Sequence, residues 1–381
     1  MAACDADSAD DFRRDFRLAQ EDVQRGVTAG RATAADTHYN KWVKYTSHMG
    51  LNSLLEGVQD KIPIIQVFLH RVRHGHLSAS NNKIRSRSAE DYVRSVAQTY
   101  LALGAPDPRL NQDGNIDFRL RRMLNAYKKA DPPPDRVKPV PVAVLRRILF
   151  IAANSLACPI VQAEADLICI AFFYLLRPGE YSMSGSESTP FEFKDVQLFQ
   201  GQRRLDLLTA SDEALMAATF ASLTFDKQKN SVRGEVIGQG RSGDPYLCPV
   251  KSLVRRIIHL RQHNASQSTP LATAYTSSQN STGITSSQLT EALQLAVRFL
   301  GPSLGFLPED VTSRSLRAAG ANALLCGGVD PDVIRLIGRW RSDEMLRYLH
   351  TQAGPVMRDF SRKMLSGGSF TLIPNQMVPI F

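Results

Sequence analysis

The chain has 381 residues, of which 43% are hydrophobic and 22% charged, so it is long enough to form two globular domains. Its formal net charge of +9 favours a polyanionic partner, and nucleic acid is the commonest one. The five cysteines are scattered and odd in number, which argues against a zinc site and favours a reducing intracellular compartment. No stretch resembles a signal peptide or reaches membrane-spanning length, so we expect no membrane association.

The first 130 residues read as helical. Residues 1–30 are polar and charged, and we expect a frayed helix or a disordered arm there, with no assigned function. Residues 31–130 contain four amphipathic patterns, which predict a small all-α bundle. The third helix is expected to open with Ser88 and Asp91 as a pair resembling a capping box, and the last to run from about Asp117 to Ala130.

This bundle carries a surplus of basic side chains. They are either an ordinary solvated face or contacts to DNA phosphates. The candidates for phosphate contacts are Lys83, Arg85 and Arg87 in a loop, and Arg119, Arg121, Arg122, Lys128 and Lys129 on the last helix.

A proline-rich spacer over residues 131–141 predicts a domain boundary, because successive prolines exclude helix and favour an extended chain. Residues 142–365 would form the second domain. Its segment ADLICIAFFYLL is apolar on all faces and predicts a buried helix that ends just before Arg177. A partly buried guanidinium needs an anionic partner; Arg177 either pairs locally with Glu180 or offsets the helix dipole, or it binds a substrate anion.

Short alternating segments between residues 191 and 238 predict a small antiparallel sheet. The next helix, over residues 248–264, has a basic face on which His259 and His263 are expected to be exposed polar residues. We expect the Ser- and Thr-rich stretch 265–286 to be a mobile loop. Residues 366–381 form an apolar tail, for which docking on a neighbouring protomer and packing on its own domain are both open.

The segment from Thr312 to His350 predicts three short helices, separated by Gly327-Gly328 and by helix caps at Asp330 and Ser342. Arg314 and Arg317 lie three residues apart and are expected to share a helix face, as a fork for phosphate oxygens or as a solvated basic face. The helix ends would gather the cationic and aromatic side chains of this segment: Arg314, Arg317, Arg339, Trp340 and Tyr348.

The pattern SLRAAGANALLCGGVDPDVIRLIGRW followed by Tyr348 resembles the C-terminal box of the tyrosine recombinase (phage integrase) family, and LLRPGEY resembles its R-x-x-E box. The resemblance implies a mainly α fold with a small antiparallel β-sheet, made of a helical core-binding domain and an α+β catalytic domain. It implies a nucleophilic tyrosine, two phosphate-binding arginines, a hydrogen-bond donor and a general acid. By position, Tyr348 is the nucleophile, and Arg177 and Arg317 are the phosphate-binding arginines. Trp340 or Arg339 is the hydrogen-bond donor. Lys229 is the general acid, with Lys227 as the second candidate. Arg314 occupies the place of the family's histidine.

The implied function is site-specific cutting and rejoining of double-stranded DNA through a 3′-phosphotyrosine, without a metal or nucleotide cofactor. The implied assembly is a dimer or tetramer on DNA, in the nucleus of a eukaryote or otherwise in the cytoplasm. Two other readings stay open. The first alternative is a degenerate or domesticated recombinase that binds DNA without cutting it. The second is a helical interaction protein whose charge serves surface solubility, and which should show no salt-dependent affinity for DNA.

Overall fold

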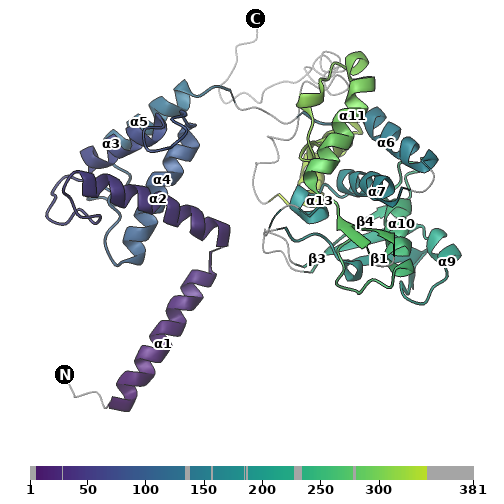
Figure 1. Ribbon diagram of the computed structural model, residues 1–381, viewed down its shortest axis with the longest axis horizontal. Coiled ribbons are helices and arrows are strands. Elements are labelled where there is room, and N and C mark those ends of the chain that lie inside the picture. The colour runs from purple at the N-terminus through teal and green to yellow at the C-terminus, as the bar shows by residue number, and fades with distance from the viewer. Residues whose placement is uncertain are drawn as a thin grey trace, which may run out of the picture. The chain divides into compact units, whose positions relative to one another are not determined.

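The computed structural model describes residues 6–340, except 28, 134–137, 156–157, 184, 186–187, 227–233 and 278–279. The chain divides into two compact units, Met1–Pro134 and Asp135–Phe381, and the division falls within the proline-rich spacer. Helices dominate both units, and the strands belong to the second unit, so the fold is mainly α with a small antiparallel sheet (Figure 1).

The first unit contains the helices α1 (Ala6–Arg25), α2 (Ala29–His48), α3 (Ile62–Arg73), α4 (Ser86–Ala102) and α5 (Phe118–Ala130). Apolar faces of α2 to α5 form its core, where Trp42 packs edge-on against Phe68 with ring centroids 5.0 Å apart. Trp42 Nε1 and the Tyr100 hydroxyl both donate to the Ser53 carbonyl oxygen, at 2.7 and 2.6 Å. These bonds satisfy the polar atoms of two large buried side chains.

The start of α4 differs from the sequence prediction. The helix begins at Ser86 with Arg85 at its N-cap, three residues earlier than a cap at Ser88 would place it. Asp91 pairs with Arg94 one turn later in the same helix. The start of α5 follows the prediction, because the Asp117 side chain accepts from the Arg119 backbone N–H.

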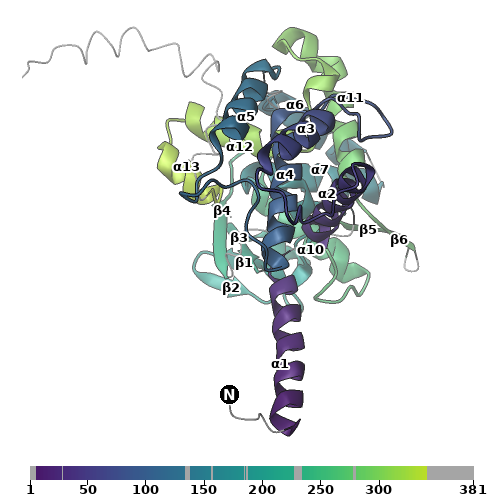
Figure 2. The same cartoon turned by 90° about the vertical axis from the view of Figure 1, so that its left-hand side faces the viewer.

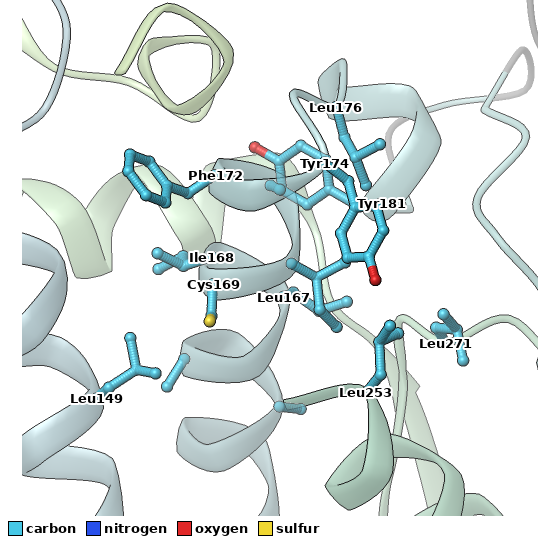
Figure 3. Close-up of a cluster of buried hydrophobic side chains, with 14 of the residues drawn as sticks. Leu149, Leu167, Ile168, Cys169, Phe172, Tyr174, Leu176, Tyr181, Leu253 and Leu271 are labelled. Carbon is cyan, nitrogen blue, oxygen red and sulfur yellow. The ribbon is translucent and has the colours of Figure 1, made fainter. Parts of the chain in front are cut away.

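The second unit is built around α7 (Pro159–Phe173), with α6 (Val142–Asn154), α10 (Pro249–Gln262) and α11 (Ser286–Leu304) beside it. The short helices α8 (Pro178–Tyr181), α9 (Asp212–Met216), α12 (Ser315–Cys326) and α13 (Pro331–Ile337) complete its helical part, together with 3₁₀ turns at Phe193–Asp195 and Pro308–Asp310. Apolar side chains on all sides of α7 explain its central place (Figure 3). Cys169 on α7 belongs to the same buried cluster as Leu149 of α6 and Leu253 of α10.

The four-stranded sheet has the order β2-β1-β3-β4, with every neighbouring pair antiparallel. Its strands are β1 (Val196–Gln200), β2 (Arg203–Leu205), β3 (Phe220–Phe225) and β4 (Glu235–Gly240), in the segments that the sequence predicts. Val196 pairs with Leu223, and Leu223 pairs with Ile237, which places apolar residues on one face against the helices. The Tyr174 hydroxyl after α7 donates to the Ala221 carbonyl oxygen at 2.8 Å and fixes the end of α7 to β3.

Two predictions for residues 248–286 are wrong. The stretch expected as a mobile loop contains a hairpin, β5 (Thr273–Ser277) paired with β6 (Asn280–Gly283). One residue of the expected basic face of α10 is internal, because Arg256 is buried and donates to the Leu271 carbonyl oxygen at 3.0 Å. His259 is half-buried, and its Nε2 accepts from the Tyr275 backbone N–H at 2.9 Å. The hairpin supplies acceptors and donors that the α10 sequence alone does not reveal.

Lowering the pH should destabilise the folded protein, because His259 takes up a proton more readily in the unfolded chain. Burial, with further contributions from Arg256 and His263, lowers the pKa of His259 to about 4. The unfolded chain therefore binds more protons than the folded chain between about pH 6.5 and 4, and stability is lost as the pH falls through that window. Urea unfolding at about pH 7.5 and about pH 5 should show a smaller pH dependence in His259→Gln than in the wild type, whereas His263→Gln should retain it. An unchanged pH dependence in His259→Gln would contradict this assignment.

Within the described ranges, no helix is both long and apolar enough to cross a membrane. The same residues contain no group of three or more His, Cys, Asp or Glu side chains placed to hold a metal ion.

Candidate active site

The candidate site is organised by the turn that follows α7. Leu175 has a φ of 52°, in the left-handed region, and its carbonyl oxygen accepts from Arg317 of α12 and from Arg339 after α13. Arg177 then precedes α8, and its backbone N–H donates to Glu180 Oε2 at 2.8 Å. The Glu180 backbone N–H donates back to the Arg177 carbonyl oxygen at 2.8 Å. This reciprocal pair holds the R-x-x-E box in one conformation.

Glu180 is the acceptor that joins two of the predicted arginines. Its carboxylate is 5% exposed, and Oε1 accepts from Arg177 Nη1 at 3.1 Å. Oε2 accepts from Arg339 Nη2 at 3.2 Å. The Arg177 side chain remains about one-third exposed, so the pair lies at the surface end of the site. The sequence analysis considered Glu180 as part of the R-x-x-E box and as a local partner of Arg177, but did not select it as a site residue.

Arg317 lies in the first turn of α12 and is buried. Its Nη1 donates to the Leu175 carbonyl oxygen at 2.8 Å, and its Nη2 donates to the Gly338 carbonyl oxygen. The guanidinium also stacks over the Trp340 ring, 4.3 Å from the ring centre. Arg317 therefore joins the turns after α7 and after α13 in one place.

The expectation that Arg314 and Arg317 share one helix face is wrong. Arg314 precedes α12 and is exposed, whereas Arg317 points into the protein. The cause is tertiary, because the carbonyl oxygens of Leu175 and Gly338 draw the Arg317 side chain inward.

Arg339 has a φ of 57°, in the turn after α13. Its guanidinium donates to the carbonyl oxygens of Tyr174 and Leu175, each at 3.2 Å, as well as to Glu180. It also stacks 3.9 Å from the centre of the Phe225 ring at the end of β3. Burial lowers the pKa of Arg339, while the carboxylate of Glu180 acts in the opposite direction. A direct contact of Arg339 with DNA would require these protein acceptors to be exchanged for phosphate.

Trp340 is mostly buried in a small apolar cluster with Leu175, Ala321 and Ile334. Gly338 makes this packing possible, because a Cβ built there would lie 1.6 Å from Trp340 Cζ3. Gly320 has a similar role on α12, where a Cβ would lie 2.2 Å from the Phe172 carbonyl oxygen. The two glycines let α12 and the turn after α13 approach α7 closely enough for the arginine contacts to form.

The predicted phosphate contacts of the first unit are all exposed, but they are not equally available. Arg119 donates to Asp60 at 2.6 and 3.0 Å and to Asp117, so its guanidinium already has carboxylate partners within the protein. Lys128 lies 3.4 Å from Glu90. The other predicted contacts are on the exposed surface of the bundle: Lys83, Arg85, Arg87, Arg121, Arg122 and Lys129.

Three predicted residues fall outside the described parts of the chain. They are the nucleophile Tyr348 and the two lysines that were considered as the general acid, Lys227 and Lys229. The segment with both lysines joins β3 to β4, and β3 ends at Phe225 under the Arg339 guanidinium.

No family model matches the sequence, and no curated protein matches it. Several solved structures align with most of the chain. They are structures of tyrosine recombinases and integrases. A lambda integrase dimer bound to a COC′ core site aligns with 14% identity and a TM-score of 0.49, covering 89% of this chain and 95% of that one. The Tn1549 transposon integrase in complex with transposon right end DNA aligns with 12% identity and a TM-score of 0.44, covering 87% and 99%. The XerA recombinase aligns with 12% identity and a TM-score of 0.35, covering 89% and 100%.

Proposed function

We propose that the protein is a DNA strand transferase of the tyrosine recombinase type. The observation that carries this proposal is the gathering of Arg177, Arg317 and Arg339 around the turn Leu175–Glu180, although Arg317 and Leu175 are 142 residues apart in the chain. Three guanidiniums in one place form a site suited to an oxyanion with several acceptor oxygens, and a phosphodiester is such a group.

The charge balance of the cluster supports an anionic ligand. Glu180 accepts hydrogen bonds from Arg177 and Arg339, and Glu235 also acts electrostatically on Arg339. A bound phosphodiester would add a negative charge and lower the electrostatic cost of holding the cations together. The exposed position of Arg177 gives such a ligand access to the cluster.

The proposed reaction is an in-line attack on phosphorus. The Tyr348 oxygen bonds to the phosphorus, the bond to the 5′ oxygen breaks, and a 3′-phosphotyrosine retains the energy of the original ester. Arg177 and Arg317 bind the non-bridging oxygens, whose negative charge must be stabilised in the transition state. Lys229 gives its proton to the leaving 5′ oxygen. Trp340 or Arg339 donates a further hydrogen bond to the phosphate.

Arg314, in place of the family's histidine, should limit the rate of strand cleavage. An arginine guanidinium is protonated at neutral pH and cannot accept the tyrosine proton, which must then pass to water. Loss of a general base costs on the order of 10²–10⁴ in rate, so we expect slow strand cleavage. Arg314 is exposed at the start of α12, where it can still bind a phosphate.

The first unit would hold the DNA backbone. The exposed Arg121 and Arg122 on α5 and the cations of the loop before α4 are suited to phosphate contacts. We propose double-stranded DNA as the substrate and a dimer or tetramer on DNA as the working form. In a eukaryotic cell this form would be nuclear.

A nicked duplex tests the proposal. A nick close to the cleavage position lets the short product diffuse away, so the covalent intermediate accumulates. We expect a complex that survives denaturant with the wild type and its absence with Tyr348→Phe. DNA from the region flanking the gene supplies the candidate sites.

The alternative function is DNA binding without cleavage, and the arginine at position 314 is the observation that favours it. The same experiment separates the two functions. Salt-sensitive binding without any covalent complex, on a DNA that the protein binds specifically, would support the alternative and contradict strand transfer.

A further inference from the structure

A polar pocket of about 260 Å³ lies where the first turns of α7 meet α10. The two helices pack side by side (Figure 2). The lining of the pocket includes Cys158, Gln162 and Asp166 from the start of α7, and Arg255 and Arg256 from α10. Its volume corresponds to several water molecules, so it has room for a small ion.

The cations of this pocket outnumber its carboxylates. Arg256 is buried, and burial lowers the pKa of its guanidinium to about 10. Its Nε and Nη2 donate to the carbonyl oxygens of Leu271 and Thr273, and among the described residues it forms no ion pair. Asp166 lines the same pocket, but its Oδ1 accepts from Arg255 Nε at 2.9 Å. Two guanidiniums therefore share one carboxylate, and an anion would lower the cost of holding them together.

The polar side chains of the pocket have unused hydrogen-bonding capacity. Within the described part of the chain, Nη1 of Arg255 and Nη1 of Arg256 have no acceptor. Asp166 is fully buried, and its Oδ2 has no donor. The Cys158 side chain does not cap α7, so the N-terminal dipole of the helix adds positive potential at the same end. A ligand with several acceptor oxygens and one O–H group would supply what these side chains lack.

The pocket is separate from the arginine cluster of the candidate active site. Helix α7 has 15 residues and is therefore roughly 22 Å long. The pocket lies at its first turns, whereas the cluster surrounds Leu175–Glu180, after its last residue. A phosphodiester bound by the cluster cannot also occupy the pocket.

We propose that this pocket binds a small oxyanion that carries a proton, as inorganic phosphate does near neutral pH. The oxygens of the ion accept from Arg255 and Arg256, and its O–H group donates to Asp166. The site does not depend on the proposed strand transfer, because its described lining contains no residue of the arginine cluster.

The test titrates sodium phosphate into the full-length protein without DNA, at constant ionic strength in chloride, and follows binding by calorimetry. We expect saturable binding with a Kd of about 1 mM or lower. Sulfate has acceptor oxygens but no proton to donate to Asp166, so it should bind at least about tenfold more weakly. Equal affinity for phosphate and sulfate would overturn the proposal, as would a wild type that binds no phosphate.

Two variants block the pocket in different ways. Gln162→Glu places a carboxylate beside the guanidiniums, and Cys158→Phe fills the space with an apolar ring. Cys158 is exposed and Gln162 half-buried, so we expect both variants to fold, as circular dichroism would check. Each should weaken phosphate binding at least about tenfold. Gln202→Glu, in the exposed turn between β1 and β2, is the matched control and should bind phosphate like the wild type. Unchanged phosphate binding in both pocket variants would overturn the proposal.

Two further measurements locate the ion. Arg177→Ala, in the arginine cluster, should retain the phosphate binding that Gln162→Glu abolishes, and its loss would place the ion at the cluster and overturn the proposal. Cys158→Phe should bind duplex DNA with the affinity and salt dependence of the wild type. A DNA affinity at least about tenfold lower would assign the pocket to a backbone phosphate of DNA and contradict a site for a free ion.

Discussion

Glu180→Gln should lower the free energy of unfolding by about 3–5 kcal/mol, because it removes the partner of a buried charge. The guanidinium of Arg339 is 4% exposed and the carboxylate of Glu180 5%, with 3.2 Å between them. The amide of glutamine preserves the shape but carries no charge, so Arg339 would remain buried next to a neutral group. Urea unfolding monitored by tryptophan fluorescence measures the loss, and Trp340 is the tryptophan of the second unit that the cluster contacts.

Asp332→Asn is the control for this change. Asp332 also pairs with an arginine, Arg335 at 3.4 Å, but it is 78% exposed, so the substitution should change stability by less than about 1 kcal/mol. Equal effects of the two substitutions would contradict the central role of Glu180. The same result would also weaken the case for a preorganised site.

Arg177→Ala should slow the formation of the covalent complex and leave the stability of the protein nearly unchanged. The Arg177 side chain is about one-third exposed, and its backbone contacts to Glu180 remain available to alanine. We therefore expect stability to change by about 1 kcal/mol or less. The rate of covalent complex formation on nicked DNA should fall about 10²- to 10³-fold, because one donor to the transition-state charge is lost.

Arg146→Ala provides the comparison for Arg177→Ala. Arg146 is an exposed arginine of the same unit that pairs with Asp244 at 2.8 Å, away from the cluster. It should leave the rate of complex formation unchanged. A rate in Arg177→Ala that stays within twofold of the wild type would remove Arg177 from the proposed chemistry.

The sequence predicts the parts of this fold that depend on local pattern. The apolar α7, the four strands of the sheet and the cap of α13 at Asp330 all follow from residue types at short spacing. The β5–β6 hairpin was missed because its Ser- and Thr-rich sequence lacks apolar alternation, and its pairing is stabilised by contacts with α10.

The side-chain directions in the site could not be predicted. The sequence assigns Arg317 and Arg339 to phosphate, yet both guanidiniums point inward and donate to carbonyl oxygens of Tyr174, Leu175 and Gly338. Those acceptors become available through the turn at Leu175, whose positive φ has no signature in the sequence LLRPGE. Glu180 did have a signal, since a carboxylate three residues after Arg177 can cap the turn that the arginine begins.

The most direct test of the proposed strand transfer is to identify the residue that becomes covalently attached to DNA. Wild-type protein trapped on nicked DNA would be digested with nuclease and protease, and the peptide that retains a nucleotide would be sequenced by mass spectrometry. We predict a nucleotide linked through its 3′ phosphate to the Tyr348 oxygen, and to no other residue. A nucleotide attached to a different side chain, or a covalent complex that persists in Tyr348→Phe, would contradict it.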